Sequence, residues 1–126
     1  MVEACDLVSE WALDPRLAVR LANVLNDWER ESSIGAQVIS GFRTRAEQEE
    51  LGRRGRPTAP FSRSTHTTCP STGADVSING FVTRAMKASF GRIVVMNGLR
   101  WGGGSQVDDI GIPSDWNHVD LGARTT

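Results

Sequence analysis

The sequence has 126 residues, of which 39% are hydrophobic and 23% charged, and its formal net charge at pH 7 is −1. This length suits a single compact domain spanning residues 1–126, and the small charge gives no long-range field to attract nucleic acid or an anionic membrane. No stretch approaches the roughly 18 consecutive apolar residues of a membrane-spanning helix. We therefore expect neither a nucleic-acid partner nor a membrane partner.

The N-terminal stretch MVEACDLVSEW carries acidic residues and lacks the basic-then-apolar order of a signal peptide. We expect synthesis in the cytoplasm without a signal peptide, so that work outside the cell would need release or delivery by another system. The two cysteines, Cys5 and Cys69, are too few for a disulfide framework. They are either two free thiols or one bridge.

The first predicted helix covers Leu13–Glu31. Asp14 is suited to cap it, and Pro15 suits the first helical position, where its missing N–H costs nothing. The apolar residues that recur at helical spacing are Leu17, Leu21, Val24, Leu25 and Trp28. The run AQVIS, Ala36–Ser40, then predicts a buried strand that ends before Gly41.

Thr44 and Glu47 have the spacing of a capping box, which predicts a second helix through about Arg54. A loop rich in Gly, Pro, Ser and Arg follows, and ADVSI, Ala74–Ile78, predicts a short strand. Asn79 is the expected cap of a third helix, which ends near Gly98.

A second long loop, residues 101–115, leads to the final predicted strand, residues 116–122. There the alternation places Val119 and Leu121 on one face, opposite Trp116, His118 and Asp120. Early helices with short scattered strands predict an α+β fold, a small antiparallel sheet with helices packed on it.

Both histidines of the chain occur near aspartates in polar surroundings. His66 precedes Asp75 by nine residues, and His118 follows Asp115 by three. Two histidines and one carboxylate are a ligand set for catalytic zinc, which leaves one position for water, and a nearby carboxylate would take the water's proton. The alternative interpretation is that His66 and Asp75 are solvated loop residues.

Two further residues have competing interpretations. Arg43 follows the first strand and could clamp a carboxylate or stabilise an oxyanion; alternatively, it is a surface residue that pairs with Glu47. Cys69 follows His66 at a spacing that zinc can use, and as a fourth ligand it would close the site to water.

The stretch 43–63 is rich in arginine and offers three interpretations: a nucleic-acid surface, a basic rim for an anionic wall polymer, or a solvated surface. The arginines are Arg43, Arg45, Arg53, Arg54, Arg56 and Arg63. Aromatic residues do not interleave with most of them, so a stacking platform for bases is missing.

Four motifs occur in the order of a known family: ISGFRT, then SRSTH with a downstream GAD, then LRWGGG, then DWNHVDL. Together they resemble the zinc peptidases of the bacterial cell wall, which include D-alanyl-D-alanine carboxypeptidases and dipeptidases and phage L-alanyl-D-glutamate endopeptidases. The resemblance covers about residues 13–122 and implies the hedgehog/DD-peptidase fold.

The resemblance implies that His66, Asp75 and His118 bind Zn²⁺, that Asp115 is the general base, and that Arg43 contacts substrate and stabilises the transition state. The implied function is zinc-dependent hydrolysis of an amide bond in peptidoglycan stem peptides, of the L-Ala-D-Glu endopeptidase or D-Ala-D-Ala carboxypeptidase type. Asp rather than Glu at the base position is more similar to the phage endopeptidases, so a phage particle or lysis system is a candidate partner.

The sequence departs from the family at two places. The segment between His66 and Asp75 is two residues longer than in the family pattern S-x-H-x-x-G-x-A-x-D, and Gly104 replaces the Asp that often follows W-G-G, with Asp108 and Asp109 as later substitutes. These departures sustain the alternative of a non-catalytic wall-binding or phage structural module with a closed or empty metal site.

Two serines and two tryptophans near the motifs also have expected positions. We expect Ser62 and Ser64 to support the His66 loop by hydrogen bonds. Trp101 and Trp116 either line the cleft or belong to the core.

Overall fold

The computed structural model describes residues 1–55, 59–61 and 63–123. The helices are α1 (Ala4–Trp11), α2 (Pro15–Ser32), α3 (Arg45–Arg53) and α4 (Arg84–Met96), with 3-10 turns η1 (Thr65–Thr67) and η2 (Gly102–Gly104). The strands are β1 (Ala36–Ser40), β2 (Gly73–Ile78), β3 (Arg100–Trp101) and β4 (His118–Asp120). Within the described residues, every helix is too short or too polar to cross a membrane.

The local signals at the starts of α2 and α3 act as predicted. The Asp14 side chain accepts a hydrogen bond from the Arg16 backbone, and Pro15 is the first residue of α2. At α3, Thr44 and Glu47 form the reciprocal capping box. The predicted α+β class is therefore confirmed, with its helices and an antiparallel sheet.

Other elements differ from the prediction. Helix α1 was not expected, and it begins without a side-chain cap, since Glu3 makes no capping hydrogen bond. Helix α4 begins at Arg84, because Thr83 rather than Asn79 accepts the capping bond from the Met86 backbone. The last strand is shorter than predicted and starts only at His118, after a turn in which the His118 N–H donates to the Asp115 carbonyl.

The sheet has the strand order β1-β2-β4-β3, and all neighbouring strands are antiparallel. In this register Asp75 of β2 lies directly opposite His118 of β4. On its other side Asp75 lies opposite Ser40, next to an irregularity in β1 between Val38 and Ser40. The sheet therefore brings the end of β1 and the two predicted ligands to the same place.

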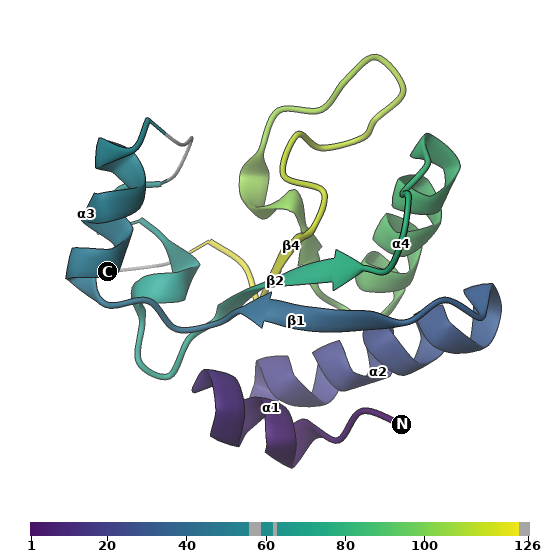
Figure 1. The fold of residues 1–126 in the computed structure, drawn as a ribbon, viewed down its shortest axis with the longest axis horizontal. Coiled ribbons are helices and arrows are strands. Elements are labelled where there is room, and N and C mark those ends of the chain that lie inside the picture. Colours follow the sequence, from purple (N-terminus) through teal and green to yellow (C-terminus); the bar gives the residue numbers. More distant parts are fainter. Residues whose placement is uncertain (56–58, 62, 124–126) are drawn as a thin grey trace.

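Alternation along β2 separates the core from the site. Ala74, Val76 and Ile78 are buried in the hydrophobic core, and Asp75 points to the opposite face. The buried residues of α2 belong to the same hydrophobic core as Ala74, Val76 and Ile78. Figure 1 shows α1 and α2 along one side of the sheet, with α3 and α4 at opposite ends of the β1–β2 pair. One face thus provides stability and the other carries the polar residues.

The tryptophans Trp101 and Trp116 pack against the core and are not among the pocket-lining residues described below. Trp101 Nε1 donates to the Trp116 carbonyl at 2.6 Å, and Trp116 meets Phe90 of α4 edge to face. Gly91 of α4 lies against the Trp101 ring so closely that a Cβ there would be 2.4 Å from ring carbons.

This contact generates a stability prediction. Gly91→Ala would gain roughly 1 kcal/mol from helix propensity, but the clash with Trp101 is an overpacking of the kind that costs about 1–3 kcal/mol. We expect net destabilisation in urea unfolding. The reverse exchange at an exposed α4 position, Ala88→Gly, is the control for propensity; a more stable Gly91→Ala protein would contradict the packing argument.

Candidate metal centre

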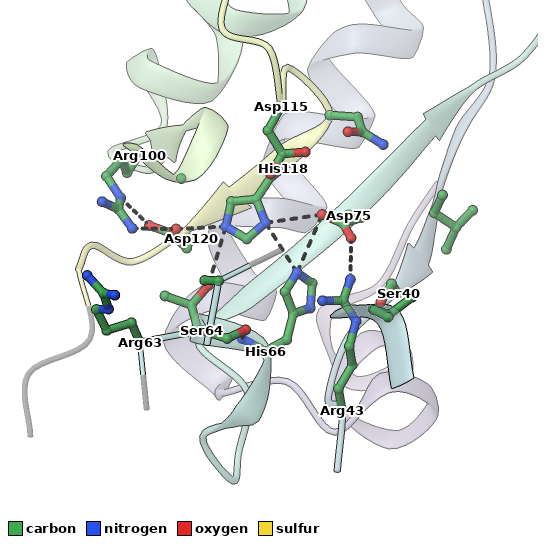
Figure 2. Close-up of a pocket in the computed structure, with 16 residues that line it drawn as sticks. Ser40, Arg43, Arg63, Ser64, His66, Asp75, Arg100, Asp115, His118 and Asp120 are labelled. Carbon is green, nitrogen blue, oxygen red and sulfur yellow. Dashed lines mark hydrogen bonds and ion pairs between the residues drawn. The ribbon is translucent and has the colours of Figure 1, made fainter. Parts of the chain in front are cut away.

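Three ligand atoms converge on the polar face of the sheet. His66 Nε2 lies 3.2 Å from His118 Nδ1 and 3.4 Å from Asp75 Oδ1, and His118 Nδ1 lies 3.1 Å from the same Asp75 oxygen. Four ligands at about 2.0–2.1 Å from a tetrahedral zinc ion lie about 3.3 Å from one another. The spacing of the three atoms therefore fits a zinc ion with one open position (Figure 2).

Local structure fixes His66 in this arrangement. The Ser64 hydroxyl accepts from the His66 backbone N–H at the start of η1, as expected, while Ser62 lies outside the described residues. The His66 carbonyl accepts from the Arg43 backbone N–H at 2.8 Å, and the His66 ring is 2.7 Å from the Gly41 carbonyl through Nδ1. His66 is buried, so its interpretation as a solvated loop residue is wrong.

The outer hydrogen bonds determine which nitrogens carry protons. The Gly41 carbonyl can only accept, so His66 Nδ1 donates and His66 Nε2 faces inward with a lone pair. His118 Nε2 lies 2.8 Å from an Asp120 oxygen and donates in the same way, which leaves His118 Nδ1 as the inward acceptor. Three acceptors then face one another, and a cation between them relieves their repulsion.

Asp120 belongs to the site as the partner of His118, with which it was predicted to share a strand face. It is fully buried, and Arg100 holds both of its oxygens at 2.8 Å. Burial alone would raise its pKa, but hydrogen bonds from His118 and Arg100 outweigh burial and keep the pKa below its ordinary value. A histidine with a carboxylate behind it is the usual outer-shell arrangement of metal-binding histidines.

The charges agree with a cation site. Burial alone would lower the pKa of His118, but hydrogen bonds to Asp120 and Asp75 raise it to about 9. Burial alone would raise the pKa of Asp75, but hydrogen bonds from His118 and His66 hold it well below its ordinary range. Without a metal, therefore, a proton on His118 supplies the positive charge.

Arg43 contacts Asp75 and Gln48 rather than Glu47, so its interpretation as a surface partner of Glu47 is wrong. Its Nη2 donates to Asp75 Oδ2 at 2.8 Å and its Nη1 to Gln48 at 3.1 Å. The ion pair is largely buried on both sides. Arg43 therefore holds the Asp75 carboxylate by one oxygen while the other oxygen faces the two histidines.

Asp115 lies at the rim of the same group, in the turn before β4. Partial desolvation raises the pKa of its carboxyl; the nearby Asp75 charge adds to this increase, although His118, His66 and Arg43 oppose it. Figure 2 shows Asp115 beside His118. A carboxylate in this position can exchange a proton with a group bound at the three ligands.

Two glycines leave room for the His118 ring. Gly103, in the W-G-G loop, has a φ of 57°, and a Cβ there would lie 2.6 Å from the ring. At Gly73, a Cβ would lie 3.1 Å from Cε1 of the same ring and 2.1 Å from the Thr65 hydroxyl. The absence of side chains at these two positions allows the backbone to approach the His118 ring closely.

The long segment between His66 and Asp75 does not displace either ligand. The Thr72 N–H donates to the Thr65 carbonyl at 3.1 Å, which closes the loop behind η1. Cys69 lies in this loop as an exposed free thiol, and Cys5 is likewise free and exposed. Of the described residues, the candidate metal group joins His66, Asp75 and His118 without Cys69.

A pocket of about 440 Å³ opens over the three ligand atoms. Its labelled lining residues in Figure 2 are Ser40, Arg43, Arg63, Ser64, His66, Asp75, Arg100, Asp115, His118 and Asp120. Asp108 and Asp109 contact Arg84 instead and are not lining residues, so they do not replace the aspartate missing after W-G-G.

The arginine-rich stretch divides into two groups. Arg45, Arg53 and Arg54 pair with Glu49 or Glu50 on their own helix, as expected of a solvated surface. Arg43 and Arg63 line the pocket, and Arg56 lies outside the described residues.

The fold, but not the sequence, matches a protein of known structure. The sequence matches no protein-family model and no curated protein. Among solved structures, the crystal structure of the Serratia marcescens L-Ala D-Glu endopeptidase ChiX matches with a TM-score of 0.62, over 87% of this chain and 80% of that chain, at 22% sequence identity. This chain therefore shares its fold with that endopeptidase.

The raised pKa of His118 predicts a pH-dependent stability. Its pKa is 6.5 in the unfolded reference and about 9 in the folded protein without metal. The protonated His118 ring therefore contributes fully to the free energy of unfolding below pH 6.5, and this contribution is lost as the pH rises to 9. We expect the Tm of chelated protein to fall over this range. Zinc-loaded protein should not show that loss, and parallel Tm curves for the two forms would contradict the assignment.

The Asp120 contact predicts an effect on metal affinity. Asp120→Asn removes the charge behind His118, and we expect zinc affinity, measured by competition with a chelating dye, to fall about 10–100-fold. Circular dichroism should confirm that the variant folds. The control is Asp109→Asn, a highly exposed position; equal affinity in both variants and the parent protein would show that Asp120 does not support the ligand.

Proposed function

We propose that this protein is a zinc-dependent peptidase that hydrolyses an amide bond in peptidoglycan stem peptides. The observation that carries the proposal is the convergence of His66, Asp75 and His118 in a pocket that also holds Asp115 and Arg43. The fold shared with the Serratia marcescens L-Ala D-Glu endopeptidase supports the choice of a cell-wall peptide as substrate.

The three ligands suit zinc because two imidazole nitrogens and one carboxylate oxygen leave one tetrahedral position open. When bound, zinc would supply a Lewis acid for the scissile carbonyl and lower the pKa of a water molecule. The chain's own contribution is to fix the two histidine rings through Gly41 and Asp120, so that Nε2 of His66 and Nδ1 of His118 already face Asp75 before a metal replaces the proton on His118.

Asp115 is the proposed general base and acid. Its carboxylate would take the proton of the attacking water and return it to the leaving amine. Its raised pKa suits this role, because a group whose pKa approaches the working pH both accepts and donates a proton more readily.

Arg43 is proposed to hold the Asp75 carboxylate and also to contact the carbonyl oxygen of the scissile amide. Two of its five N–H groups are used by Asp75 and Gln48. The remaining donors, on a guanidinium that lines the pocket, can stabilise negative charge that develops on the carbonyl oxygen.

Between the two bond types considered, we favour cleavage of an L-Ala-D-Glu amide over that of a D-Ala-D-Ala amide. The support is the activity in the name of the structural neighbour and the Asp at the base position.

The proposal is tested by mass spectrometry of purified peptidoglycan after digestion. We expect new L-Ala-terminated fragments with zinc-loaded protein and none after chelation. Asp115→Asn should lower kcat by roughly 10²–10⁴-fold while zinc content and circular dichroism stay unchanged, because Asp115 is not one of the three ligands. Asp109→Asn is the matched control and should retain activity.

Three outcomes would contradict the proposal. Cleavage that survives complete chelation would remove the metal from the mechanism, and full activity of Asp115→Asn would remove the base. Peptidoglycan that binds the zinc-loaded protein but stays intact would support the non-catalytic wall-binding module instead.

A further inference from the structure

Among the residues that the structure describes, three arginines line the pocket, and two of them are neutralised by buried or half-buried carboxylates. Arg43 forms an ion pair with Asp75 at 2.8 Å. Arg100 binds both oxygens of the fully buried Asp120. Their charges are therefore already compensated within the protein by the carboxylates that they hold at the candidate metal centre.

Arg63 differs from the other two. It lines the same pocket, and among the residues that the structure describes, no carboxylate lies within ion-pair distance of its guanidinium. Its side chain is exposed, so it is hydrated rather than buried in the protein. Among the described lining residues, Arg63 is the cation whose charge is uncompensated.

The backbone of Arg63 is fixed close to the metal ligands. Its N–H and that of Ser64 both donate to the Pro60 carbonyl, at 2.9 and 3.0 Å. The Ser64 hydroxyl in turn accepts from His66. Figure 2 shows Arg63 and Arg43 on opposite sides of His66, and both line the pocket that holds the three candidate ligands.

We propose that Arg63 binds a free carboxylate of the substrate beside the scissile amide, which restricts the substrates to acidic peptides; this inference rests on the proposed peptidase function. A glutamyl residue whose nitrogen forms the scissile amide has two carboxyl groups. When one of them continues the peptide, the other is free. Guanidinium and carboxylate pair through two parallel hydrogen bonds, which gives both charge and geometric selectivity.

The test uses two synthetic peptides that differ in one group. Both contain an L-Ala–D-Glu amide, and the glutamyl residue carries either its free carboxylate or a carboxamide. We expect the zinc-loaded parent protein to show a 10- to 100-fold higher kcat/KM for the acid. Arg63→Gln should lose this factor on the acid and stay unchanged on the amide, while Arg63→Lys should retain part of it.

Arg92→Gln is the matched control, because Arg92 lies on α4 and pairs with Glu31, outside the pocket. It should keep the parent's preference. The inference would be overturned if Arg63→Gln lowered kcat/KM equally on both peptides. It would also be overturned if the parent protein hydrolysed the acid and the amide with equal kcat/KM.

Calorimetric binding to Asp115→Asn protein separates this inference from the proposed function. That variant keeps the pocket arginines, and it should bind the acid more tightly than the amide by the same 10- to 100-fold. The additional change Arg63→Gln should abolish the difference. If the parent hydrolyses neither peptide, the proposed function fails while this binding difference still decides the role of Arg63; equal binding of both peptides would contradict it.

Discussion

The antiparallel pairing of β2 with β4 is the constraint on which the rest of the site depends. It sets Asp75 directly opposite His118, and the pairing of β2 with β1 sets Ser40 opposite Asp75, so that Gly41 and Arg43 follow within reach. A slip of one residue in either pairing would turn Asp75 toward the core face. The hydrophobic packing of Ala74, Val76 and Val119 on that face therefore fixes the candidate ligands Asp75 and His118 on the other.

Electrostatics explains why this arrangement calls for a cation. The outward nitrogens of His66 and His118 are used by Gly41 and Asp120, so the inward nitrogens meet Asp75 as acceptors. A proton fills this role in the metal-free protein, which is why the pKa of His118 is raised to about 9. A metal ion bound in the proposed centre would therefore replace this proton. Arg43 and Arg100 hold the carboxylates of Asp75 and Asp120 by ion pairs.

The sequence allowed some features to be predicted because their causes are local. The caps at Asp14 and Thr44 depend on residues within one helical turn, and His66 and His118 are candidate ligands by residue type and resemblance. The partners of Arg43, and the role of Asp120 behind His118, depend on strand pairing across long stretches of chain. Helix α1 lacks a side-chain cap, and β3 has only two residues, so neither leaves a strong local pattern.

The most direct measurement is X-ray absorption at the zinc edge of protein reconstituted with the metal, together with its stoichiometry. The account predicts one zinc per chain, surrounded by nitrogen and oxygen at about 2.0–2.1 Å with an imidazole signature from two histidines. Zinc–sulfur scattering at about 2.3 Å would instead place Cys69 in the site and close it to water. Failure to bind zinc stoichiometrically, or an unchanged spectrum in His118→Ala protein, would contradict the three-ligand centre itself.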